Sequence, residues 1–142
     1  MDTGKSALGL DGNVAAALGY PVGIIAVISL IMEKENRFVK FHALQSILLH
    51  VGFLVVAIGL LIIFVILMIV GAMASVASSA AGSSAGALGG MFGSLFGMLL
   101  FLVWMVLIVV YLVGLIISAV KAYQGVMYKF PIVGKMADKW VK

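Results

Sequence analysis

The feature that most constrains the fold is an unbroken absence of charge from Phe41 to Val120. These 80 residues contain no Asp, Glu, Lys or Arg, although the 142-residue chain carries 9 Lys and Arg and 5 Asp and Glu. Soluble domains contain about 25% charged residues, whereas this chain has 10% charged and 65% hydrophobic residues. The polar groups are too few to cover a soluble domain, and we expect an integral membrane protein.

Three apolar blocks are long enough to cross a bilayer. A helix needs about 20 apolar residues to cross a hydrocarbon core about 30 Å thick, and a backbone in lipid must satisfy its own hydrogen bonds. Continuous apolarity argues against barrel strands, which alternate. The sequence therefore predicts an all-α integral membrane protein with a single membrane domain over residues 1–142. The three transmembrane helices are expected at about 13–32, 43–70 and 95–120.

The first of these blocks contains the stretch LGYPVG, Leu18–Gly23. Pro21 removes a backbone donor, and the neighbouring glycines weaken the helix further, so a kink or a break is expected there. A re-entrant break is one interpretation. We favour a kink that the span tolerates, because such breaks are readily satisfied in membrane helices.

A dense charge cluster, Glu33–Lys40, predicts an aqueous turn at residues 33–42 between the first two spans. With three spans, this turn and the tail after Val120 share one side and hold eight Lys and Arg, against Lys5 alone on the other. Cytoplasmic segments carry the excess of Lys and Arg. The prediction is a multi-pass protein of the cell's inner (plasma) membrane with its N-terminus outside and its C-terminus cytoplasmic.

A segment rich in Gly, Ser and Ala, residues 71–94, is expected to link the second and third spans. The sequence leaves open whether it is a loop or a helix. If it is helical, glycines spaced by four would let another helix approach closely, as small residues do in membranes. The predicted helix-packing interface contains Gly82, Gly86, Gly89, Gly90, Gly93 and Gly97.

A polar stripe enters the second span at His42, Gln45, Ser46 and His50, which share one helix face. Polar groups in a span tend to face the protein interior, so interhelical hydrogen bonds are expected. The two histidines lie about 12 Å apart along a helix, which is too far for one metal ion. A haem would need a histidine from a second copy. We expect no catalytic residues, no cofactor and no metal site.

The tail, residues 131–142, has its apolar and charged residues on opposite faces of a helix. This pattern predicts an amphipathic interfacial helix on the cytoplasmic surface, or a helix docked on a partner protein. The residues expected at the membrane surface are Lys135, Lys139, Trp140 and Lys142. Because the basic residues lie at membrane boundaries, we expect lipid headgroups and not nucleic acid as their partners.

Two stretches carry a resemblance to a known family: EKENRFVKFHALQSILL in the first turn, and AVKAYQGVMYKFPIVGKMADK after the last span. They resemble an uncharacterised family of small prokaryotic membrane proteins, which is grouped with the twenty-kilodalton channel component of the chloroplast inner-envelope import machinery. The resemblance implies a helical membrane protein with no assigned catalytic residues.

The expected function is that of a non-enzymatic subunit or assembly component of a larger membrane complex, with lipids and other subunits or further copies of itself as partners. The alternative is an oligomeric channel or a protein-translocation component.

Overall fold

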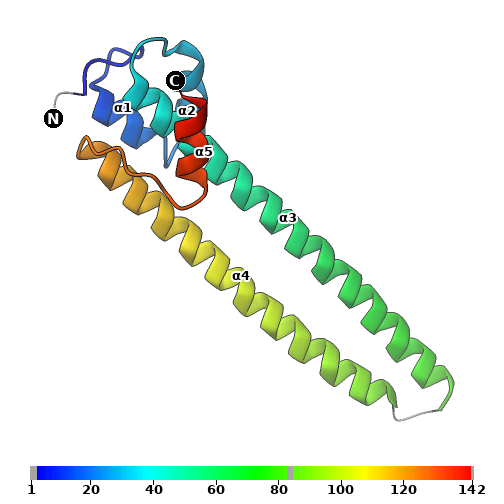
Figure 1. The fold of residues 1–142 in the computed structure, drawn as a ribbon. Coiled ribbons are helices and arrows are strands. Elements are labelled where there is room, and N and C mark those ends of the chain that lie inside the picture. Colours follow the sequence, from blue (N-terminus) through cyan, green and yellow to red (C-terminus); the bar gives the residue numbers. More distant parts are fainter. Residues whose placement is uncertain (1–2, 83–84, 142) are drawn as a thin grey trace. The chain divides into compact units, whose positions relative to one another are not determined.

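The computed structural model describes residues 3–82 and 85–141, and within these ranges all regular secondary structure is helical (Figure 1). The helices are α1 (Gly12–Leu18), α2 (Gly23–Met32), α3 (Arg37–Ala80), α4 (Ala85–Tyr123) and α5 (Val133–Trp140). The chain divides into two compact units. Unit 1 comprises Met1–Phe53 and Val110–Lys142, and unit 2 comprises Leu54–Val109. The all-α prediction is confirmed.

Two of the helices in the described ranges, α3 and α4, are long and apolar enough to cross a membrane. The prediction of three spans is not confirmed, because the first apolar block is broken into α1 and α2. With 7 and 10 residues, these helices are about 10 Å and 15 Å long, well short of a bilayer core. Pro21 lies in the break, where it has no N–H to continue a helical hydrogen-bond ladder.

The two long helices extend beyond the expected spans. Helix α3 begins at Arg37, inside the expected turn, and runs to Ala80; α4 begins at Ala85. The Gly/Ser/Ala linker is therefore mostly helical. Its serines do not break the helix, because their hydroxyls donate back to carbonyls one turn earlier: Ser78 Oγ lies 2.6 Å from the carbonyl of Ala74.

Unit 1 has a small core built from both ends of the chain. Ala16 and Tyr20 pack with Ala122 from the end of α4, and Phe41 packs with Ala137 from α5. Helices α1 and α2 also contact each other. Residues far apart in the sequence thus close one compact unit.

Unit 2 consists of the distal parts of α3 and α4, and its apolar side chains are mostly exposed. Val55 and Val106, for example, are 64% and 62% exposed. An apolar surface of this kind suits contact with lipid or with other apolar helices.

Candidate functional sites: a buried polar network and a glycine-lined groove

The first candidate site is the buried polar network of unit 1, formed by Tyr20, His42, Gln45 and Ser46 with nearby backbone groups. His42 Nε2 lies 3.2 Å from the carbonyl of Val126, and its Nδ1 lies 2.9 Å from the Tyr20 hydroxyl. A carbonyl only accepts, so Nε2 carries a proton and donates. In a neutral imidazole Nδ1 then accepts from Tyr20. His42 is fully buried, so these bonds satisfy both of its ring nitrogens.

Gln45 extends the network to the segment that follows α4. Its Nε2 donates to the Tyr20 hydroxyl at 2.7 Å and to the carbonyl of Tyr128 at 3.2 Å. Its Oε1 accepts from the N–H of Phe130 at 3.1 Å. One side chain of α3 therefore holds the turn after α1 and the chain between α4 and α5, which is a structural role for a buried amide.

Ser46 and His50 complete the predicted stripe. Ser46 Oγ donates to the carbonyl of Gly19 at 2.7 Å, which satisfies a backbone group at the break between α1 and α2. His50 is only partly buried; its Nδ1 lies 2.8 Å from the Ser46 carbonyl, and its ring meets Tyr111 edge-on. The stripe thus lies on a protein-facing side of α3.

The N-terminal segment is held against the charged turn by Glu33 and Asn36. Glu33 is 6% exposed and accepts from the N–H of Ala7 at 2.8 Å and of Asn36 at 3.1 Å. Burial alone would raise the pKa of the Glu33 carboxyl, but the backbone N–H donors outweigh it and lower the pKa below its ordinary value.

The tail helix α5 is docked on the start of α3. Arg37 lies 3.4 Å from Asp138, and Lys129 donates to the same carboxylate at 2.7 Å, a bond that lowers the pKa of Asp138. A Cβ added at Gly134 would lie 2.6 Å from Gln45 Oε1. This glycine is therefore required for the close approach of α5 to the network.

Of the residues expected at the membrane surface, Trp140 is 75% exposed, and Lys135 and Lys139 also lie on the outer part of α5. Lys142 lies outside the described residues. The apolar face of the tail is divided: Ala137 and Val141 are buried in a cluster with Phe41, whereas Trp140 remains exposed.

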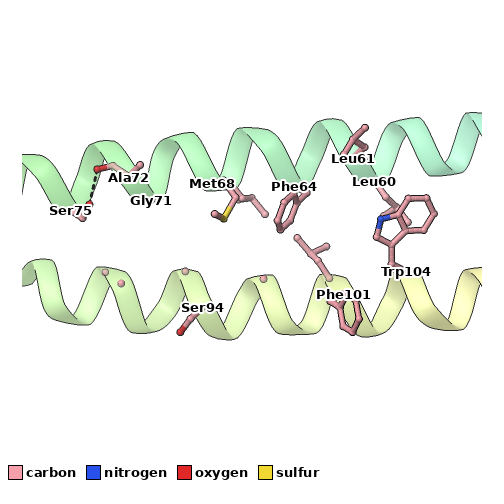
Figure 2. A pocket seen from close by; sticks show the side chains of 16 residues that line it. Leu60, Leu61, Phe64, Met68, Gly71, Ala72, Ser75, Ser94, Phe101 and Trp104 are labelled. Carbon is pink, nitrogen blue, oxygen red and sulfur yellow. Dashed lines mark hydrogen bonds between the residues drawn. The ribbon is translucent and has the colours of Figure 1, made fainter.

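The second candidate site is the glycine-lined groove of unit 2, between α3 and α4. It has a volume of about 710 Å³ and is lined almost wholly by apolar side chains and glycine. Figure 2 shows Phe64 and Met68 of α3 directed toward α4, and Trp104 of α4 directed toward α3. The glycines that line it are Gly71, Gly89, Gly90, Gly93 and Gly97.

The six glycines of the predicted interface have four different environments. Gly82 lies in the turn after α3 with φ +65°, so it does not extend a helical glycine face. A Cβ at Gly86 would lie 3.3 Å from Ser78 Cβ, which is close helix packing. A Cβ at Gly97 would make ordinary contact with Phe64 at 4.0 Å. The remaining glycines, Gly89, Gly90 and Gly93, have nothing within 4 Å of that position.

The groove offers little hydrogen bonding to a ligand. Ser75 and Ser94, its hydroxyl-bearing residues, donate to carbonyls of their own helices at 2.8 Å. The described ranges contain no group of three or more His, Cys, Asp or Glu that could hold a metal ion. The groove can therefore contact apolar surface, and the polar network holds unit 1 together.

Sequence reasoning missed several residues that build unit 1, above all Tyr20 and Asn36. Tyr20 is one of the two hydroxyl-bearing residues of an uncharged apolar block, with Ser29, and lies next to Pro21. A polar group in that position requires a partner, and this was the available signal. Asn36 gave none, because an Asn in a charged turn is ordinary.

Taken together, the two apolar helices, the lipid-suited surface of unit 2 and the two sites define a small all-helical protein of membrane type. Residues 7–137 match the model of the magnetosome magnetite crystal formation protein family, and the chain belongs to this family.

Archaeal relatives support the membrane class. The chain is 30% identical over 137 residues to UPF0132 membrane protein MJ1527 of Methanocaldococcus jannaschii, a match that covers 96% of this chain and 74% of the relative. It is 52% identical over 56 residues to UPF0132 membrane protein MJ1443 of the same organism, covering 39% of this chain and 51% of the relative.

A UPF0132 membrane protein of Archaeoglobus fulgidus is 53% identical over 47 residues, covering 32% of this chain and 46% of the relative. The match to this protein and to MJ1443 thus spans only about half of each relative's length. No solved structure matches the chain. The expected small membrane-protein family is supported, but none of these comparisons links the chain to the chloroplast import component.

Proposed function

We propose that the protein is a non-enzymatic component of a larger membrane complex, as a subunit or as an assembly factor, and that the glycine-lined groove is its contact with a neighbouring helix. The observation that carries this proposal is the open side of α4: a Cβ at Gly89, Gly90 or Gly93 would meet nothing within 4 Å. The groove beside these glycines has a volume of about 710 Å³.

The physical reason is the way helices associate in lipid. Lipid tails are as apolar as leucine, so no hydrophobic drive joins two helices there, and close van der Waals packing over small residues takes its place. Gly89 and Gly93 present bare backbone at a spacing of four residues, on a helix with lipid-suited neighbours. A helix of another subunit, or of a second copy of this chain, fits such a groove.

The family name refers to magnetite crystal formation, and the archaeal relatives are described only as membrane proteins. The description of the archaeal relatives supports the role of a membrane component. A contribution to crystal formation would be made from within such a complex. The expected partners are membrane lipids and other membrane subunits, with no role for nucleic acid.

Cross-linking in intact membranes tests the groove as a contact. The chain has no native cysteine, so Ser75→Cys places one thiol on the side of α3 that faces the groove (Figure 2), while Val106→Cys places one on an exposed part of α4 outside it. A short bis-maleimide should join Ser75→Cys to a cysteine of a second copy, or to a partner cysteine, far more efficiently than Val106→Cys.

Equal cross-linking yields from the two positions would show that the groove is not the interface. A homo-oligomer that also conducts ions in planar bilayers would favour the alternative, an oligomeric channel or translocation component.

A further inference from the structure

Both ends of the first apolar block lie side by side in unit 1. Asn36 Nδ2 donates to the carbonyl of Thr3 at 2.7 Å and to that of Lys5 at 3.3 Å. Glu33 accepts from the N–H of Ala7 at 2.8 Å. A helix that crosses a bilayer separates its two ends by about 30 Å, so these contacts are incompatible with a first block that crosses.

The tail joins the same place. Asn13 Nδ2 donates to the carbonyl of Tyr123 at 2.9 Å, and Arg37 Nε donates to the carbonyl of Val141 at 3.4 Å. The N-terminal segment, the charged turn and the tail are therefore neighbours within unit 1.

The break between α1 and α2 lies deeper along α3. The carbonyl of Gly19 bonds to Ser46, and a Cβ at Gly23 would lie 3.7 Å from the ring of His50. His50 is 13 residues from Arg37, which is about 20 Å along a helix. From there α2 returns to the start of α3. Irregular backbone at membrane depth is tolerated where protein groups satisfy it, as Ser46 does here.

We propose that α1 and α2 form a re-entrant hairpin, which enters and leaves the bilayer on one side, and that unit 1 binds the anionic headgroups of that leaflet. The chain then crosses the membrane twice, through α3 and α4, with both termini on the same side. This arrangement differs from the three-span expectation, which put the N-terminus outside.

The charge distribution identifies the leaflet. All 9 Lys and Arg and all 5 Asp and Glu fall within the ranges of unit 1, a net charge of +4, and unit 2 has none. An excess of Lys and Arg is cytoplasmic, and the cytoplasmic leaflet carries anionic lipids that attract basic segments. The charge of unit 1 is complementary to that surface.

One face of α2 provides the apolar part of the contact. Ile24, Ile28 and Ile31 recur at helical spacing and are 72%, 40% and 74% exposed, whereas Ala26 and Ser29 on the other side are buried. On a hairpin that enters one leaflet, such a stripe meets acyl chains.

Cysteine labelling in intact cells tests the topology. Ala7, Ala81 and Gln124 are exposed in the structure, so single cysteines there report the side of each segment to an impermeant maleimide. We expect Ala81→Cys to be labelled in intact cells, and Ala7→Cys and Gln124→Cys only after permeabilisation. Labelling of Ala7→Cys from outside, with Gln124→Cys protected, would mean that the first block crosses and would overturn the hairpin.

Fluorescence quenching tests the leaflet contact. In a Trp104→Phe variant, Trp140 is the remaining tryptophan of the chain. In reconstituted vesicles we expect brominated phosphatidylglycerol to quench Trp140 several-fold more strongly than brominated phosphatidylcholine, and the difference to shrink at high salt. Equal quenching by both lipids would refute anionic recognition. Neither experiment requires the protein to assemble with a partner, so their results are independent of the cross-linking test of the groove.

Discussion

The Tyr20 hydroxyl lies 2.9 Å from Nδ1 of His42, and this contact joins the turn after α1 to the buried start of α3. Three aromatic rings surround the imidazole, from Tyr20, Phe38 and Phe41, all in edge-on geometry. The pair lies at the centre of the polar network, so it should contribute measurably to the stability of unit 1.

Tyr20→Phe tests this contribution. The change keeps the ring and leaves His42 Nδ1 without its donor, and a buried polar group without a partner costs about 1–3 kcal/mol. We expect a loss of that size in unfolding by SDS in mixed micelles. Tyr111→Phe is the matched control, because its ring stacks on Phe53 with centroids 4.0 Å apart and keeps that contact. A loss no larger than the control's would mean that the Tyr20–His42 bond is not stabilising.

Glu33 gives the stability a pH dependence. Its folded-state pKa is lowered, so its contribution is fully present above the unfolded pKa, near 4.3, and is lost as the pH falls through the lower folded value. In Glu33→Gln, the side-chain amide N–H would be directed at one of the two backbone N–H groups that now donate to the carboxylate. This contact between two donors should destabilise the folded protein by about 1–3 kcal/mol at pH 7.

The measurement is the free energy of unfolding of parent and Glu33→Gln between pH 7 and pH 3. The difference in the free energy of unfolding between parent and variant should become smaller as the pH falls below about 4. A gap that stays constant with pH would show that the charge of Glu33 does not stabilise the fold.

Substitution by alanine should have opposite effects on stability at Gly134 and at Gly90. Gly134→Ala would place Cβ 2.6 Å from Gln45 Oε1 and from the backbone of Lys129, so α5 should be displaced and the protein destabilised by about 1–3 kcal/mol. The Cβ added by Gly90→Ala would have no atom within 4 Å. Gly90 lies within α4, and in a helix Ala is favoured over Gly by about 1 kcal/mol. Thermal unfolding in detergent compares them, and equal melting temperatures would contradict the docking of α5.

Helical periodicity and charge were sufficient to predict an all-α membrane protein, because apolar blocks of about 20 residues have few other solutions. They were insufficient for the first block. Its composition suits a span, but the break at Pro21 is stabilised by Ser46 and Gln45, which lie 25 and 24 residues further along the chain. Such long-range bonds have no local signature.

The candidate sites show the same limit. The spacing of His42, Gln45, Ser46 and His50 placed them on one helix face, but the partners of that face come from segments on both sides of it in sequence. For the glycines, spacing could not distinguish Gly82 in a turn from Gly86 against Ser78 or Gly93 in open space.

The mass of the protein in detergent-free native nanodiscs tests the central claim, that the chain works within an assembly through its groove. The parent should exceed the 14.9 kDa of one chain, as a homo-oligomer or with a partner. Gly93→Leu, which adds a bulky side chain to the groove, should shift it toward a single chain. Gly59→Leu, at an equally open glycine outside the groove, should leave the assembly intact. A parent protein of single-chain mass, or a Gly93→Leu variant that assembles like the parent, would contradict the account.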